Sequence, residues 1–202
     1  MTIFTQLEKM QPVACGGFSE LYILDGKAVK LLEDACYRDV LEECYKQNIA
    51  AEAGLAPKVH AVAKDGEDKV LIVMDAIDTD VWFNPDALDD VAPTLLGELP
   101  VDEMEVGLKL YCQMLQAGIV HADFHTGNWF MNDADKAIAI DFGISSELAT
   151  AGEKHLKRAL QFILPALDRL GFGYLVSNLQ AAWNEGLDAT RQELIEVANE
   201  IA

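Results

Sequence analysis

The stretch that decides the fold, IVHADFHTGNWFMNDADKAIAIDFG, spans residues 119–143 and carries three polar side chains at a telling spacing. Asn128 follows Asp123 by five positions, and Asp141 comes directly after the apolar run KAIAI. Polar residues at 132–135 separate two apolar runs, so they predict the turn of a hairpin. We therefore expect a loop with Asp123 and Asn128 to lie beside a strand that ends at Asp141.

These three side chains suit a metal site next to a base. Mg²⁺ prefers hard oxygen ligands and takes one or two carboxylates, and substrate phosphates complete its shell. Asp141 and Asn128 meet that need, which leaves Asp123 free to accept a proton from an attacking hydroxyl group. A base beside two metal ligands is the arrangement used in phosphoryl transfer.

The chain up to residue 77 predicts a small sheet with one helix. Two β-rich runs flank the Asp-Gly dipeptide at 25–26, which favours a tight type I′ hairpin, and two more flank residues 65–66. Between the hairpins, residues 37–54 predict a helix whose apolar face we assign to Val40, Leu41, Cys44, Tyr45 and Ile49. The sheet must be mainly antiparallel, because both hairpins are short.

After residue 77 the pattern becomes irregular and then helical. Residues 78–100 are acidic and contain prolines. Asp102 and Glu105 have the spacing of a capping box, which predicts a helix from there to Gly118. Helical patterns return from residue 153 to the end, so the sequence predicts an α+β protein with a β-rich first half and a helical second half.

Composition excludes several classes of function. The net charge of −19 and a pI near 4.3 argue against a nucleic-acid partner and against an anionic membrane surface. The four cysteines form no C-x-x-C pair, which favours a reducing compartment. Neither a secretory leader nor an apolar run of membrane-spanning length is visible, so we expect a cytoplasmic protein.

The sequence resembles the protein-kinase-like phosphotransferase superfamily. HADFHTGN is similar to its catalytic loop, H-x-D-x-x-x-x-N, and the string at 141–143 is similar to its D-F-G. Upstream, ACGGFSELYIL resembles the Gly-rich loop, and LIVMDAI resembles the strand and linker that hold the adenine. The resemblance implies ATP and Mg²⁺ as cofactors. It also implies a bilobal fold with an N-terminal lobe over 1–77 and a reduced C-terminal lobe over 78–202.

The resemblance assigns a role to each matching residue. Those of the Gly-rich loop are Ala14, Gly16, Gly17, Phe18 and Ser19. Lys30 is the lysine that neutralises the α- and β-phosphates, with Glu42 as its helix partner and Glu43 as the alternative. The linker residues that contact the adenine are Asp75, Ala76 and Ile77. Asp123 is the base, and Asn128 and Asp141 are the metal ligands.

Departures from the superfamily pattern are informative. Ala14 and Ser19 replace the first and third glycines of the loop, so the phosphates are held less tightly or differently. Ala122 replaces the arginine that pairs with a loop phosphate, which argues against control by loop phosphorylation. His125 gives the D-x-H-x-x-N spelling, which is similar to antibiotic phosphotransferases, choline-type kinases and the ABC1 group. No A-P-E string follows, and too few residues remain for a full C-terminal lobe.

Three kinds of phosphotransferase-like protein fit this pattern. The first is a minimal Ser/Thr protein kinase, similar to the shortened kinases of bacterial effectors and phages and to the RIO type. The second is a small-molecule kinase of the aminoglycoside or choline type, and the third is a nucleotide-binding pseudokinase. The short chain predicts an open acceptor site, which favours a protein substrate over an enclosed metabolite. The likeness to effector kinases implies delivery into the cytoplasm of a host cell.

Two histidines and a basic run leave alternatives open. His121, Asp123 and His125 form an H-x-D-x-H pattern that also suits Zn²⁺, although a metallohydrolase leaves Lys30 unexplained. We expect His121 to brace the loop by hydrogen bonds, and His125 either to contact a phosphate or the substrate or to have a structural role. The basic run is either a site for an acidic substrate or a solvated helix face, and consists of Lys154, His155, Lys157 and Arg158.

Overall fold

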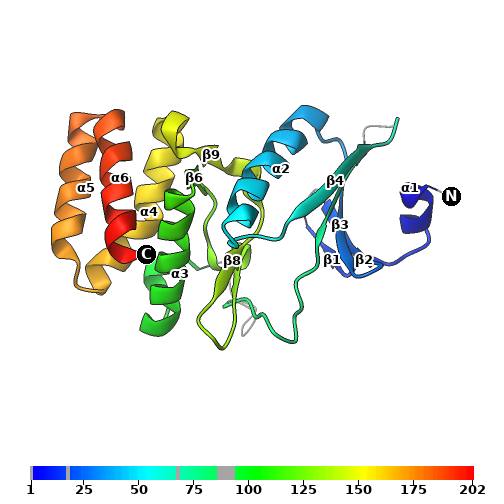
Figure 1. The fold of residues 1–202 in the computed structure, drawn as a ribbon, viewed down its shortest axis with the longest axis horizontal. Coiled ribbons are helices and arrows are strands. Elements are labelled where there is room, and N and C mark those ends of the chain that lie inside the picture. Colours follow the sequence, from blue (N-terminus) through cyan, green and yellow to red (C-terminus); the bar gives the residue numbers. More distant parts are fainter. Residues whose placement is uncertain (1, 17–18, 67–68, 86–93) are drawn as a thin grey trace.

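The computed structural model describes residues 2–16, 19–66, 69–85 and 94–202. Gly17 and Phe18, which we assigned to the Gly-rich loop, lie outside the described residues. A β-sheet forms one end of the molecule and a set of helices forms the other (Figure 1). The fold is therefore α+β with the bilobal arrangement that the sequence predicts, whereas the boundary at residue 77 stays a prediction.

The sheet has five strands in the order β1-β2-β3-β5-β4, and every neighbouring pair is antiparallel. Its strands are β1 (Ala14–Cys15), β2 (Ser19–Leu24), β3 (Lys27–Leu32), β4 (Val59–Lys64) and β5 (Val70–Asp75). The predicted hairpin at 25–26 is confirmed: φ is +51° at Asp25 and +74° at Gly26, as a type I′ turn requires. Lys30 pairs with Leu21 and Ile72 on either side, so it lies on the central strand.

Helix α2 (Tyr37–Glu52) packs against this sheet, but its buried face differs from the predicted one. Leu41 and Tyr45 are 42% and 57% exposed. The buried residues recur every three or four positions, as one helical face requires, and are Val40, Cys44, Gln47 and Ala50. The side of α2 that faces the sheet is thus the side that carries Glu43.

A short helix, α1 (Ile3–Leu7), precedes the sheet and was not predicted. Leu7 is buried and packs in a cluster with Tyr22, Val29 and Leu71, which come from the sheet. This apolar cluster explains why the chain forms a helix here: covering one face of a small sheet removes apolar surface from water.

The second half of the chain is helical around a small hairpin. Its helices are α3 (Val101–Gln116), α4 (Glu153–Arg169), α5 (Gly173–Glu185) and α6 (Leu187–Ile201). Its strands are β6 (Ile119–Val120), β7 (Trp129–Met131), β8 (Ala137–Ala139) and β9 (Ser146–Glu147). Four 3₁₀ turns join these elements: η1 (Leu96–Glu98), η2 (Thr126–Asn128), η3 (Phe142–Ile144) and η4 (Leu148–Thr150).

The predicted capping box at Asp102 is wrong. Helix α3 begins at Val101, with Pro100 at the N-cap, so Asp102 already lies inside the first turn. Proline suits this end because the first turn has no acceptor for its missing N–H group. The carboxylates of Asp102 and Glu103 then interact favourably with the positive end of the helix dipole.

The large core holds the loop at residues 121–128 in place. Phe124 lies within that loop and is fully buried, with its ring stacked on Trp129 and edge-on to Tyr111. Gly107 on α3 makes room for this packing, because a Cβ there would approach Trp129 to 2.9 Å. None of the helices in the described parts of the chain combines the length and hydropathy that a membrane span requires.

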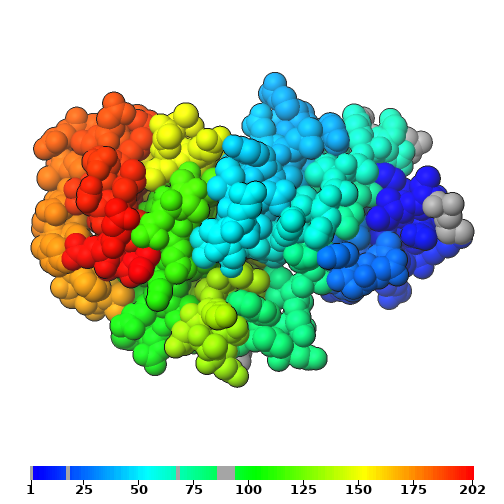
Figure 2. Space-filling view, viewed as in Figure 1, coloured from blue at the N-terminus to red at the C-terminus, as the bar shows by residue number. Residues whose placement is uncertain are grey.

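Helix α2 also connects the two ends of the molecule. Its side chains, cyan in the space-filling view, lie between the sheet and the helical end (Figure 2). Its Lys46 donates a 2.6 Å hydrogen bond to the carbonyl oxygen of Ser145, just beyond η3. A second connection joins the segment after β5 to β7, where Phe83 and Met131 exchange backbone hydrogen bonds of 2.8 and 2.9 Å. The sheet end and the helical end of the molecule are therefore held together by defined contacts.

Candidate active site

A cavity of about 780 Å³ lies between the sheet and the hairpin of β7 and β8. From the sheet it is lined by Leu21, Ala28, Lys30 and Met74, and from the hairpin side by Phe130 and Asp141. Of the residues that we assigned to nucleotide binding, those that line the cavity are Ala14, Gly16, Ser19, Lys30, Asp75 and Ile77. Ala76 and Glu42 do not line it. Its volume and its apolar walls with few charges are typical of a small-molecule site.

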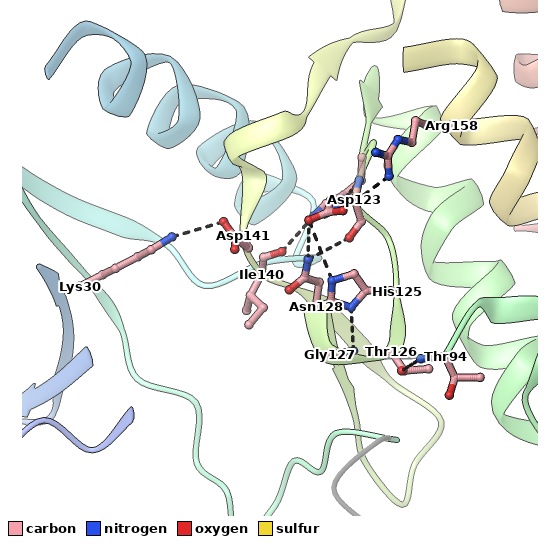
Figure 3. Close-up of polar contacts among 11 residues, drawn as sticks. Lys30, Thr94, Asp123, His125, Thr126, Gly127, Asn128, Ile140, Asp141 and Arg158 are labelled. Atoms are coloured by element: carbon pink, nitrogen blue, oxygen red, sulfur yellow. Dashed lines mark hydrogen bonds and ion pairs between the residues drawn. The ribbon is translucent and has the colours of Figure 1, made fainter. Parts of the chain in front are cut away.

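Lys30 joins the two sides of this cavity. Its Nζ is 3.2 Å from Oε1 of Glu43 and 3.3 Å from Oδ1 of Asp141, so residues 111 positions apart in sequence meet (Figure 3). The side chains of Lys30 and Glu43 are mostly buried, whereas that of Asp141 is half exposed. Burial lowers the pKa of Lys30, but the two carboxylates outweigh burial and hold its pKa above the ordinary value. The amine is thus a fixed positive charge.

The helix partner of Lys30 is Glu43, and our choice of Glu42 is wrong. Glu42 is exposed and lies 3.9 Å from Arg38 on the surface of α2. Adjacent helical residues point about 100° apart, so only one of the two glutamates can face the sheet. The rotated buried face of α2 selects Glu43. We had placed Tyr45 on that face, and its exposure explains the error.

Asp141 has an unusual backbone conformation. Its φ of +60° and ψ of +71° lie in the left-handed region, which is uncommon for residues other than glycine and recurs at functional sites. Gly143 lies next to this ion pair, since a Cβ there would be in van der Waals contact with Oε2 of Glu43 at 3.4 Å. The D-F-G string therefore presents Asp141 to Lys30 while Phe142 is buried in the core.

Asn128 is tied to the proposed base. Its Nδ2 donates to the backbone oxygen of Asp123 at 2.9 Å and to the carboxylate Oδ2 at 3.4 Å. Because the amide nitrogen is the donor in these contacts, the amide oxygen is the atom that Asn128 offers to a cation. The loop around Asn128 is also fixed from outside, as the Thr94 N–H donates to Oγ1 of Thr126 at 2.9 Å (Figure 3).

His121 has the bracing role that we predicted. It is fully buried, its Nε2 donates to the carbonyl oxygen of Ile140 at 2.9 Å, and its Nδ1 accepts from the Asp123 N–H at 3.3 Å. Burial lowers its pKa, so the ring is neutral. Both ring nitrogens are used in hydrogen bonds, which argues against a Zn²⁺ site. Among residues whose positions are described, no group of three or more His, Cys, Asp or Glu side chains could hold a metal ion.

Two basic side chains flank the carboxylate of Asp123. Nε2 of His125 is 3.9 Å from Oδ2, and Nη1 of Arg158 is 3.9 Å from Oδ1 (Figure 3). The other ring nitrogen of His125 accepts a hydrogen bond from the Gly127 N–H at 3.1 Å, which orients the ring. From the sequence, the run that contains Arg158 is either a site for an acidic substrate or a solvated helix face, and only the fold brings α4 to the loop. In the sequence, the run of basic residues that contains Arg158 was the only indication of its place in the site.

The residues present fit ATP and Mg²⁺. Lys30 supplies a positive charge inside a cavity of suitable size, with apolar walls for a base. Asp141 and Asn128 supply one carboxylate and one amide oxygen, and Mg²⁺ characteristically takes few protein ligands and completes its shell with phosphate and water. The roles of these residues stay predictions, but the chemistry of their side chains agrees with those roles.

Comparison with known proteins agrees with this geometry. Residues 100–168 match the family model of the ABC1 atypical kinase-like domain, which belongs to the protein-kinase-like superfamily. The matched segment contains Asp123, Asn128 and Asp141 and runs from α3 to near the end of α4. No curated protein sequence matches the chain.

Proposed function

We propose that this chain, a member of the protein-kinase-like superfamily, is an ATP- and Mg²⁺-dependent phosphotransferase whose acceptor is a Ser or Thr hydroxyl group of a protein. The observation that supports this most strongly is the 3.3 Å contact between Lys30 and Asp141. It places a buried cation from the sheet beside a carboxylate from the D-F-G string, at the wall of a nucleotide-sized cavity.

The residues divide the work of phosphoryl transfer. Lys30, fixed by Glu43, binds the α- and β-phosphates, and the linker at Asp75–Ile77 contacts the adenine. Mg²⁺, when bound by Asp141 and Asn128, neutralises charge on the phosphates. Asp123 orients the acceptor hydroxyl and takes its proton, while the γ-phosphorus–oxygen bond to ADP breaks and the bond to the acceptor oxygen forms. Positioning and charge stabilisation thus supply most of the catalysis.

A protein acceptor is favoured because the base is reached from the surface. The side chain of Asp123 is 30% exposed and does not line the nucleotide cavity. Between Phe142 and Glu153 the chain has only β9 and two 3₁₀ turns, so no long insertion covers Asp123 from this side. An open surface admits a side chain of an extended protein segment. Because ATP is the donor, we place the activity in a cytoplasm; delivery into a host cell stays a prediction.

A small-molecule kinase is the second candidate. The D-x-H-x-x-N spelling of the catalytic loop favours it, because that spelling is similar to antibiotic phosphotransferases and choline-type kinases. A third outcome, a pseudokinase, requires a missing group, yet Lys30, Asp123, Asn128 and Asp141 are all present. The acceptor therefore has to be identified by experiment.

The test is incubation with γ-labelled ATP and Mg²⁺, alone, with whole-cell lysate and with a panel of aminoglycosides and choline. We expect label in protein bands, and no label with Asp141→Asn. Label in small molecules alone contradicts the protein acceptor but keeps the phosphotransferase. Nucleotide binding without transfer to any acceptor contradicts catalysis and indicates a pseudokinase.

A further inference from the structure

Helix α4 begins soon after the D-F-G string in the sequence. Residues 144–152 are the whole connection between the D-F-G string and α4. This short connection brings Arg158 to 3.9 Å from Oδ1 of Asp123 (Figure 3). A distance of 3.9 Å is too long for a hydrogen bond, so this pairing leaves the guanidinium donors of Arg158 for another anion.

Further basic side chains gather near Arg158. Lys154 and His155 precede it by four and three positions, so all three share one side of α4. Lys46 of α2 donates a 2.6 Å hydrogen bond to the carbonyl oxygen of Ser145, in the connection that precedes α4. Burial, together with the charges of Lys46 and Lys154, lowers the pKa of His155, so this ring offers a hydrogen-bond donor and not a positive charge.

This gathering runs against the composition of the chain. The protein has 15 Lys and Arg residues against 34 Asp and Glu, yet three of the 15 lie within residues 154–158. At physiological salt, charges farther than about 8 Å are largely screened, so an acceptor at this surface interacts mainly with the side chains near it and not with the overall charge of −19. An approaching acceptor therefore meets Arg158 beside the base, with Lys154 on the same side of α4.

We infer that this basic side of α4, defined by Lys154, His155 and Arg158, is the acceptor site and selects hydroxyl groups that have an acidic neighbour in the peptide. The inference rests on the proposed function and adds the substrate class. A carboxylate or phosphate on the acceptor pairs with the planar guanidinium of Arg158 through two hydrogen bonds. Asp123 then binds the hydroxyl group beside it. Polycationic acceptors such as aminoglycosides are repelled by the charges of Lys154 and Arg158.

The test uses one serine peptide in three forms, with Glu, Gln or Lys at the positions flanking the serine. kcat and KM are measured for the wild-type chain with Mg²⁺ and ATP. We expect kcat/KM to be about tenfold to a hundredfold higher for the Glu form than for the Lys form, as hydrogen bonds between charged groups produce. The matched variants are Arg158→Ala, Arg158→Glu and Lys109→Ala, which removes one exposed cation on α3.

The variants separate acceptor recognition from a structural role of Arg158. Recognition predicts that Arg158→Ala loses the preference through a higher KM for the Glu form, and that Arg158→Glu reverses it in favour of the Lys form. Lys109→Ala should keep the wild-type preference. If Arg158 only holds Asp123, every peptide slows equally and the preference stays, which would overturn the inference.

The outcome also separates this inference from the proposed function. Transfer to all three peptides with equal kcat/KM keeps the protein kinase and overturns the acidic preference. Transfer to aminoglycosides but to none of the peptides overturns both the protein acceptor and the acidic site. Direct binding of the fluorescent Glu-form peptide, measured by anisotropy without ATP, gives a second readout that Arg158→Glu should weaken.

Discussion

Nε2 of His121 donates a 2.9 Å hydrogen bond to the carbonyl oxygen of Ile140, the residue before Asp141. On its other side, the same ring accepts from the backbone N–H of Asp123. One buried imidazole thus joins the loop that carries Asp123 to the segment that carries Asp141. Any shift of the backbone at Asp123 relative to the backbone at Ile140 requires this link to change.

Replacing His121 should therefore destabilise the protein. In His121→Ala the carbonyl oxygen of Ile140 loses a buried donor, and an unsatisfied buried group costs about 1–3 kcal/mol before any cost of the cavity. Urea denaturation measures the change in the free energy of unfolding. His60→Ala, at a partly exposed histidine on β4, is the control and should cost less. Equal losses in the two variants would contradict the bracing role.

His121 also predicts a pH dependence of stability. Burial lowers its pKa in the folded protein, whereas in the unfolded chain the pKa returns to about 6.5. Below that value the unfolded state binds a proton that the folded state excludes, so the free energy of unfolding falls as the pH falls. The measurement compares wild type with His121→Gln between pH 7.5 and 5. The decline should be shallower in the variant; identical slopes would show that His121 does not titrate on unfolding.

Two adjacent glutamates provide a sharp test of the cavity. Glu43→Gln removes the charge that holds Lys30, and a displaced amine should lower kcat/KM for ATP by about 100-fold, as a misplacement of about 1 Å can do. Glu42→Gln removes the same charge one position away, from an exposed side chain, and should leave kcat/KM within about twofold. The reverse order of effects would restore Glu42 as the partner.

The sequence predicted the local elements well because their signals are local. Asp25 and Gly26 determine the first hairpin, and the apolar run before Asp141 determines a strand. The choice between Glu42 and Glu43 depends on how α2 is rotated against the sheet. Because Tyr45 is apolar but exposed, the apolar positions alone indicate the wrong buried face of α2. Only the packing of α2 against the sheet decides between Glu42 and Glu43.

The contact between Arg158 and Asp123 could not be predicted from local sequence patterns, for a different reason. The two residues come from separate elements, and their distance depends on how α4 packs against the core through residues such as Leu156 and Ile163. Helix α1 was missed because its five residues are too few for periodicity to be read, and its apolar side chains are explained only by the sheet face that they cover.

The two aspartates should fail in different ways. Asp141→Asn weakens the Mg²⁺ site and removes a charge 3.3 Å from Lys30, so both transfer and Mg²⁺-dependent nucleotide binding should fall. Asp123→Asn removes the base but leaves the cavity intact, because Asp123 does not line it. It should lose transfer, by about 100-fold or more, and keep nucleotide affinity. Calorimetric titration with a non-hydrolysable ATP analogue separates the two. Full activity of Asp123→Asn would show that another group is the base.

A pair of glycines tests how the core supports the catalytic hairpin. A Cβ on Gly107 would lie 2.4 Å from Cδ1 of Leu96 and 2.9 Å from Cζ2 of Trp129, so Gly107→Ala should force these side chains apart and cost about 1–3 kcal/mol. Gly173, at the start of α5, has no such neighbour within 4 Å, and Gly173→Ala should be neutral or slightly stabilising because alanine favours helix. Urea denaturation of both variants measures the difference. Since Trp129 follows Asn128 directly, Gly107→Ala should also reduce transfer, while Gly173→Ala should not. Wild-type stability of Gly107→Ala would mean that the contact between α3 and the hairpin is looser than the structure shows.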